Sequence, residues 1–136
     1  GVRRSRVVKT GYCTLVDDCY NANPTSDRAA IDSLASLSGR HVCILGDMLE
    51  MGGNAPELHR SVGEYAAAHG VDLVITQGEL AKYIAEGAGT AGVHYADRAS
   101  LLAALPELLH EGDVVLVKAS HGAHFEEISE AVKQLS

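Results

Sequence analysis

Three short polar segments carry the side chains of this sequence that could do chemistry, and each follows an apolar run. The apolar runs at 12–16, 41–45 and 114–117 have the length and composition of buried strands. The carboxylates, amides, amine, hydroxyl and imidazole that follow them are Asp17, Asp18, Asn21, Asn23, Asp47, Glu50, Lys118, Ser120 and His121. In an open α/β sheet the carboxyl ends of the strands form one edge, where ligands bind. We therefore predict a ligand site at that edge.

The densest of these segments is 17–26, with the sequence DDCYNANPTS. Asn23 followed by Pro24 predicts the start of a helix over 27–38, because Asn caps free N–H groups and Pro suits the first helical position. Those N–H groups and the helix dipole favour an anion. A plain turn-and-cap role for the Asp and Asn residues is the alternative at this point.

Lys118 comes directly after the apolar run 114–117. A lysine at the end of a buried strand can reach a phosphate or a carboxylate. The alternative is a solvated lysine at a strand end. His121 and His124 are three residues apart, but no third or fourth ligand follows at a known metal-site spacing, so no metal site is predicted.

His59 falls in the first turn of an expected helix, where a partly buried histidine with satisfied hydrogen bonds is expected. A hydrolase triad of Ser120, His59 and Asp47 has no GxSxG nucleophile elbow to support it. The sequence also contains no GxxxxGK[ST] phosphate loop, and no GxGxxG follows the first strand. Loops with ligand-binding side chains but no phosphate loop indicate that this chain forms half of a ligand site.

Length and composition limit the class of protein. The 136 residues suit a single domain, residues 1–136. The chain is 46% hydrophobic but 4% aromatic, so its core must be built from Val, Ile, Leu and Ala, which suits a parallel sheet covered on both faces. A net charge of −7 argues against nucleic acid or anionic membrane as a partner. Three cysteines without CxxC spacing indicate reduced, buried thiols of a cytoplasmic protein.

The pattern of apolar runs and turn residues predicts the fold. A hairpin of 6–9 with 12–17 is followed by alternating helices and strands with short connections. The expected strands are 41–45, 71–76, 92–95 and 114–117. The first expected helix ends at Gly39, the second runs from Asn54 to Gly70 with Glu57 completing a capping box, and the third covers 78–88. The fourth runs from Asp97 to Gly112 with a kink or restart at Pro106, and the fifth begins near Ala123. This is a Rossmann-like, doubly wound α/β fold with a mostly parallel sheet of about six strands, helices on both faces and an N-terminal antiparallel hairpin strand. A start directly on a strand suggests a piece of a longer polypeptide.

Three segments resemble, in order and spacing, motifs of one enzyme family. They are DDCYNANPTS (17–26), GDMLEMG (46–52) with His59 downstream, and VKASH (117–121). The chain is similar over nearly its whole length to the C-terminal domain of the Mur ligases that join D-Ala-D-Ala to UDP-MurNAc-tripeptide in bacterial cell-wall synthesis.

The resemblance implies a three-domain enzyme in which ATP phosphorylates the terminal carboxylate of UDP-MurNAc-tripeptide. The dipeptide amine then attacks the acyl phosphate, giving an amide, ADP and phosphate. The family's phosphate loop, magnesium ligands and carbamylated lysine lie on a central domain, so ATP and Mg²⁺ would be bound mainly there. The C-terminal domain would close over the nucleotide, help to bind the dipeptide and be inactive alone.

Roles for individual residues follow from the same resemblance. The residues expected to face the nucleotide are Asp18 (near the ribose), Tyr20, Asn21 and Asn23. Those expected to face the dipeptide carboxylate or the reacting phosphates are Lys118, Ser120 and His121. Those expected to line the cleft or order its loops are Asp47 and His59. Ala119 and His121 stand where the family usually has Gly and Arg, and imidazole is a weaker carboxylate clamp than guanidinium. Asp27 stands where the family often has Met, and we expect it on the surface.

Two alternatives remain from the sequence. One is a free-standing α/β binding or regulatory module without its own catalysis. The other is the matching domain of a Mur ligase that adds glutamate or diaminopimelate, against which the residues YNANP at 20–24 argue. A longer source gene with GxxGKT upstream would distinguish the ligase from the free-standing module.

Overall fold

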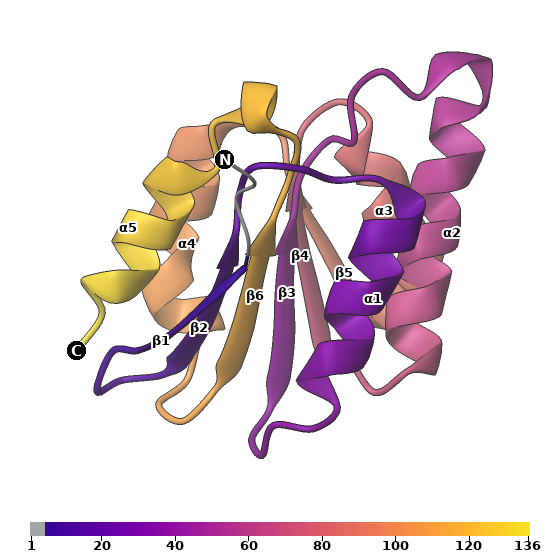
Figure 1. Ribbon diagram of the computed structural model, residues 1–136. Coiled ribbons are helices and arrows are strands. Elements are labelled where there is room, and N and C mark those ends of the chain that lie inside the picture. The colour runs from indigo at the N-terminus through magenta and orange to yellow at the C-terminus, as the bar shows by residue number, and fades with distance from the viewer. Residues whose placement is uncertain (1–4) are drawn as a thin grey trace.

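A mixed sheet forms the centre of the molecule. In the computed structural model, which describes residues 5–136, six strands pair in the order β1-β2-β6-β3-β4-β5 (Figure 1). Their bounds are β1 Arg6–Lys9, β2 Thr14–Asp18, β3 His41–Leu45, β4 Leu73–Gln77, β5 Gly92–Tyr95 and β6 Val114–Lys118. β1 pairs antiparallel with β2, and the other pairs are parallel. The predicted fold class, including the hairpin strand, is confirmed.

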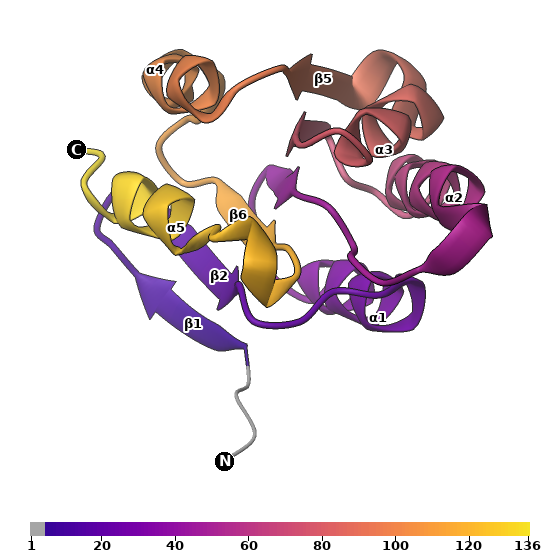
Figure 2. The ribbon, with the colours of Figure 1, turned by 90° about the horizontal axis from the view of Figure 1, so that it is seen from above.

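Helices cover both faces of this sheet (Figure 2). The helices are α1 Pro24–Leu34, α2 Ala55–Ala68, α3 Ala81–Ala88, α4 Arg98–Leu108 and α5 Glu126–Lys133, with 3₁₀ turns η1 Gly52–Asn54, η2 Gly89–Ala91 and η3 His121–Ala123. α1, α2 and α3 pack on one face, and α4 and α5 pack on the other. No helix among the described residues is long and apolar enough to cross a membrane.

The alternation of side chains along the strands divides the core in two. In β3, Cys43 and Leu45 join the cluster under α1, α2 and α3, whereas Val42 and Ile44 join the cluster under α4 and α5. This is the period-two pattern of a strand buried on both faces. Every residue of β6 is buried, as expected for the strand at the middle of the sheet.

The topology creates a switch point at the carboxyl ends of β6 and β3. These strands are neighbours, but the chain leaves β3 for α2 on one face and leaves β6 for α5 on the other. At such a point the loops diverge and open a crevice. The fold therefore places the loops after β2, β3 and β6 around one opening.

Several predicted boundaries are wrong. α1 ends at Leu34, before Gly39, and α5 begins at Glu126, after a 3₁₀ turn. α4 runs through Pro106 without a restart and ends two residues later at Leu108. A proline this close to the helix end removes only one late hydrogen bond, which explains why the helix tolerates it.

The predicted capping box at the start of α2 is also wrong. Asn54 makes no capping hydrogen bond through its side chain. Its backbone, with φ −94° and ψ 13°, belongs to the η1 turn that leads into α2, and not to the extended conformation that capping requires.

Candidate functional site

The structure brings the three predicted loops together around a cleft of about 500 Å³ at the carboxyl edge of the sheet. Its lining residues are Tyr20, Asn21 and Ala22 from the first loop, Leu49, Glu50 and Met51 from the second, and Ser120, His121 and Gly122 from the third. Of the predicted binding residues, those that line this cleft are Tyr20, Asn21, Ser120 and His121.

Ser120 is the point at which the three loops interlock. Its backbone N–H donates to the Asp47 carbonyl (3.1 Å), and its Oγ accepts from the Leu49 N–H (2.9 Å). The same hydroxyl donates a longer hydrogen bond of 3.5 Å to the Ala22 carbonyl. The hydroxyl therefore has a structural role as well as a place on the cleft wall.

Two flat rings stand side by side at the cleft. Tyr20 and His121 are stacked, with their ring centroids 5.8 Å apart and their planes 20° from parallel. His121 is exposed, and Tyr20 is half-buried. Such a pair offers planar faces and polar edges to a ligand that carries a flat group.

Asn23 holds the start of α1 and does not line the cleft. Its Oδ1 accepts from the Ser26 N–H (2.8 Å), and its own N–H donates to Ser26 Oγ (3.1 Å). This reciprocal pair is a capping box, so the predicted cap is confirmed. The Oδ1 of the side chain that the resemblance assigns to the nucleotide is thus engaged by the helix.

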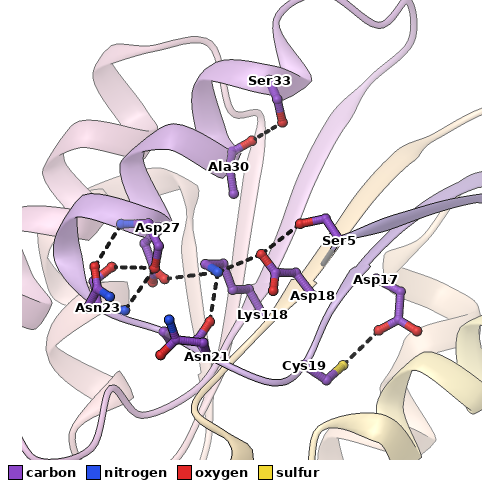
Figure 3. Close-up of polar contacts among 12 residues, drawn as sticks. Ser5, Asp17, Asp18, Cys19, Asn21, Asn23, Asp27, Ala30, Ser33 and Lys118 are labelled. Carbon is purple, nitrogen blue, oxygen red and sulfur yellow. Dashed lines mark hydrogen bonds and ion pairs between the residues drawn. The ribbon is translucent and has the colours of Figure 1, made fainter. Parts of the chain in front are cut away.

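Lys118 lies behind the first loop (Figure 3). It is 1% exposed, so the solvated strand-end lysine is excluded. Its Nζ donates to Asp18 Oδ2 (2.6 Å) and to the Asn21 carbonyl (2.8 Å). The ammonium therefore ties the end of β2 to the loop that forms the cleft wall.

Asp27 corrects the expectation of a surface residue, because it is fully buried. It lies in the first turn of α1, which faces the ends of β2 and β6, and its Oδ1 is 4.0 Å from Lys118 Nζ. Burial raises the pKa of Asp27 to about 7, although the Lys118 charge opposes that rise. Neither carboxylate oxygen has a hydrogen-bond partner among the described residues.

Asp47 orders the loops from beneath. Its Oδ1 accepts from the Leu80 and Ala81 N–H groups (3.1 and 2.8 Å) and so supplies the cap that α3 lacks in its own sequence. Gly78 makes this approach possible, since a Cβ there would lie 2.3 Å from the same oxygen.

His59 performs a similar task for the second loop. It is fully buried, its Nε2 accepts from the Met48 N–H (2.9 Å), and its Nδ1 lies 2.7 Å from the Ala55 carbonyl, to which it donates. Desolvation lowers the pKa of His59, which keeps the ring neutral. With Ser120, His59 and Asp47 each bound to backbone groups, the structure gives no support to a hydrolase triad.

Arg98 is a loop-ordering residue that the sequence patterns did not single out. Its guanidinium donates to the Ala123 and His124 carbonyls (2.8 and 3.0 Å), to Gln77 Oε1 (2.9 Å) and to Glu127 Oε1 (3.2 Å). It also lies 4.9 Å from the centre of the Phe125 ring. One side chain of α4 thus fixes the far end of the loop that carries Ser120 and His121.

The charge of the cleft favours some ligand groups over others. Glu50 is the acidic residue of the lining, and it adopts a left-handed backbone with φ 63°. Among the described lining residues none is Lys or Arg. Such a wall suits a base, a ribose or a dipeptide backbone better than a triphosphate. Within residues 5–136, no group of three or more His, Cys, Asp or Glu is arranged to hold a metal ion.

The three cysteines are buried, free thiols, as predicted. Burial raises the pKa of Cys19 to about 12, with a further contribution from its hydrogen bond to Asp17 Oδ1 (2.9 Å). Burial also raises the pKa of Cys43. Burial therefore disfavours the nucleophilic thiolate form of Cys19 and Cys43.

Comparison with known proteins shows the family. The family model described as "Mur ligase, glutamate ligase domain" matches residues 3–121, so the chain belongs to this family. It is 37% identical over 135 residues to the UDP-N-acetylmuramoyl-tripeptide–D-alanyl-D-alanine ligase of Bacillus subtilis, covering 94% of this chain and 30% of that ligase. The ligase of the same name from Escherichia coli is 39% identical over 122 residues, covering 88% and 27%.

Solved structures agree with these relatives. MurF ligase from Thermotoga maritima in complex with ADP matches with a TM-score of 0.82 at 27% identity, over 94% of this chain and 30% of that one. MurF from Acinetobacter baumannii matches with a TM-score of 0.87 at 28% identity, over 95% and 30%. The resemblance drawn from the three motifs is confirmed. The chain spans about a third of the length of the relatives it matches.

Proposed function

We propose that this chain is the C-terminal domain of an ATP-dependent amide ligase that joins D-Ala-D-Ala to UDP-MurNAc-tripeptide through an acyl phosphate. The observation that carries the proposal is 37% identity, across 94% of the chain, to a Bacillus subtilis ligase whose name states this activity. The other domains of the ligase would belong to the same polypeptide, and residues 1–136 would form one domain of it. A cytoplasmic location is part of the proposal.

The cleft would serve the ligase as one wall of the active site. ATP would supply the phosphoryl group that activates the tripeptide carboxylate, and the resulting acyl phosphate must be kept from water. A domain that closes its loops over the nucleotide provides that exclusion and holds the dipeptide amine in line for attack. Because the described cleft lining holds neither Lys nor Arg, the phosphates and Mg²⁺ would be bound mainly by the central domain.

The geometry divides the proposed site residues into two sets. Tyr20, Asn21, Ser120 and His121 line the cleft, which supports our proposal that they touch the nucleotide or the dipeptide. The set that acts from behind, by fixing the loops or the start of α1, comprises Asn23, Asp47, His59 and Lys118. Asp18 pairs with Lys118, and we propose that it also meets the ribose of the nucleotide. This arrangement supports a role in closure and positioning, without a catalytic residue that acts alone.

The test is phosphate release by the full-length polypeptide from the source gene. We expect turnover only when ATP, UDP-MurNAc-tripeptide and D-Ala-D-Ala are all present. Turnover with glutamate or diaminopimelate in place of the dipeptide would point to another Mur ligase. A complete gene of 136 codons without any turnover would point to the free-standing binding module.

A companion measurement is calorimetry of this chain alone with ATP. Since most phosphate contacts would lie on the central domain, we expect ATP to bind more weakly than a Kd of about 10 μM, which is about −7 kcal/mol. Tighter binding would contradict the idea that this chain is half of the nucleotide site.

A further inference from the structure

The most unusual polar group in the described structure is the Asp27 carboxylate. Native proteins satisfy nearly all buried polar atoms, and an exception calls for an explanation. Both oxygens of Asp27 are buried without a hydrogen-bond partner among the described residues, yet the Lys118 ammonium is only 4.0 Å away (Figure 3). The Lys118 side chain is itself 2% exposed, and its Nζ already pairs with Asp18 Oδ2 at 2.6 Å.

An ammonium has three N–H donors. Two of those on Lys118 are directed to Asp18 Oδ2 and the Asn21 carbonyl, which leaves one for Asp27. A buried ammonium without any counter-ion costs several kcal/mol. Lys118 therefore needs at least one ionised carboxylate at all times, and the structure places two within reach.

The two carboxylates differ in how freely they can move away from the Lys118 ammonium. Asp18 has a side chain 16% exposed at the end of β2, next to the first loop of the cleft. Asp27 is fully buried and is fixed in the first turn of α1, where the helix dipole favours a negative charge. Asp18 can thus turn toward a ligand, whereas Asp27 stays beside Lys118.

We propose that Asp27 is a positioning residue, a second counter-ion that takes over the Lys118 ammonium when Asp18 turns to a ligand in the cleft. Lys118 then keeps its hydrogen bond to the Asn21 carbonyl, and the first loop keeps its shape during binding. The proposal rests on the proposed function only in taking Asp18 as the residue that meets the ligand.

The replacement of Asp18 by Asp27 as the counter-ion of Lys118 depends on pH, because only an ionised Asp27 can act as a counter-ion. The charged or titratable groups that face Asp27 are Lys118 from β6, Asp18 from β2, Arg28 from α1 and Cys43 from β3. Burial raises the pKa of Asp27 to about 7, so the carboxylate is mostly ionised at pH 8 and protonated at pH 5. The second counter-ion is therefore available at pH 8 and absent at pH 5.

A double-mutant cycle on this chain tests the shared ammonium without any ligand. The variants are Asp18→Asn, Asp27→Asn and the double variant, compared by urea unfolding at pH 8 and pH 5. At pH 8 we expect Asp18→Asn alone to change the unfolding constant little. The unfolding constant of the double variant should exceed the product of the two single changes by at least about tenfold. At pH 5 the coupling disappears, because Asp27 is neutral before it is mutated.

The matched control is Asp32→Asn, on the exposed face of the same helix, which should combine additively with Asp18→Asn at both pH values. Additive effects of Asp18→Asn and Asp27→Asn at pH 8, or equal coupling at both pH values, would overturn the proposal. If the double variant does not fold, the proposal is tested by the hydrogen exchange of the Lys118 ammonium in Asp18→Asn, followed through its ¹⁵N resonance. It should stay protected from exchange at pH 8 and lose protection at pH 5; protection that is the same at both would overturn the proposal.

The positioning role is tested in the full-length ligase. In Asp27→Asn we expect the KM for ATP to rise severalfold at pH 8 with kcat unchanged, and the rise to vanish at pH 6. An unchanged KM in an enzyme that turns over normally would overturn the role. Absence of turnover in the wild type would instead count against the proposed function, and the unfolding cycle would still decide whether Asp27 is the second counter-ion.

Discussion

At the scale of single residues, the polar side chains at the strand ends either face the cleft or hold its walls. Tyr20 and His121 face the cleft, whereas Lys118, the residue that the sequence pattern favoured most as a ligand contact, is buried behind it. A lysine after a buried strand can reach outward or fold back onto neighbouring loops. Here Asp18 and the Asn21 carbonyl draw it inward.

His59 leads to a prediction on pH. The folded state lowers the pKa of His59 below the ordinary value of 6.5, so the stability that His59 contributes is present above about pH 6.5 and is lost as pH falls through the folded pKa. Protonation of Nε2 would also break the bond from the Met48 N–H. We expect the wild type to lose stability below about pH 6 more steeply than a His59→Gln variant in urea unfolding.

The same histidine allows a direct spectroscopic check. Nitrogen-15 NMR should show His59 as the Nδ1–H tautomer at neutral pH, because Nδ1 donates to the Ala55 carbonyl. The exposed His110, in the segment after α4, is a suitable control. A charged His59 ring at pH 7 would contradict the proposed ordering of the second loop.

At the scale of elements, two similar sequence signals have different outcomes. Asn23-Pro24 and Asn54-Ala55-Pro56 both place Asn before a helix with proline near its start. Asn23 is extended, with φ −152° and ψ 167°, and caps α1, whereas Asn54 continues the η1 turn. The sequence pattern identifies a helix start in both cases, but the preceding backbone decides whether the cap forms.

This difference predicts unequal costs of two matched substitutions. Asn23→Ala should destabilise the chain by about 1 kcal/mol, because the Ser26 N–H loses its acceptor. Asn54→Ala should cost only a few tenths of a kcal/mol, because no capping bond is lost. Chemical unfolding of both variants is the measurement, and equal costs would show that the two helix starts are held in the same way.

Arg98 leads to a prediction about the third loop. In Arg98→Lys, a single ammonium cannot reproduce the bonds to the Ala123 and His124 carbonyls and to Gln77. We expect severalfold faster hydrogen exchange at the His124 amide, which donates to the His121 carbonyl. Arg60→Lys, at a more exposed ion pair with Glu86, is the control and should leave that rate unchanged. Unaltered exchange in Arg98→Lys would show that Arg98 does not hold the loop.

At the scale of the whole molecule, the sequence predicted the sheet, the hairpin and the edge that carries the cleft. Those features follow from local patterns of apolar runs and turn residues. The burial of Lys118 and Asp27 and the contacts of Arg98 were not predictable in this way. They depend on how α1 and α4 approach the strand ends, which is set by packing between segments far apart in the sequence.

The chain has the charge pattern of a partial site. Its cleft offers two aromatic rings, an amide and one carboxylate, and the described lining includes neither Lys nor Arg. A nucleotide triphosphate bound there would need cations from beyond the described lining. The length of the relatives, about three times that of this chain, agrees with a further contribution from the rest of the polypeptide.

The most direct test of the central claim uses the full-length polypeptide with Tyr20→Ala and His121→Ala, because these two rings line the cleft. His69→Ala, at the exposed C-cap position after α2, is the control. We expect each cleft variant to remain folded, with a cooperative unfolding transition, and to lose at least about tenfold in kcat/KM, or about 1.4 kcal/mol. Wild-type kcat/KM in both cleft variants would contradict the assignment of this cleft to the active site.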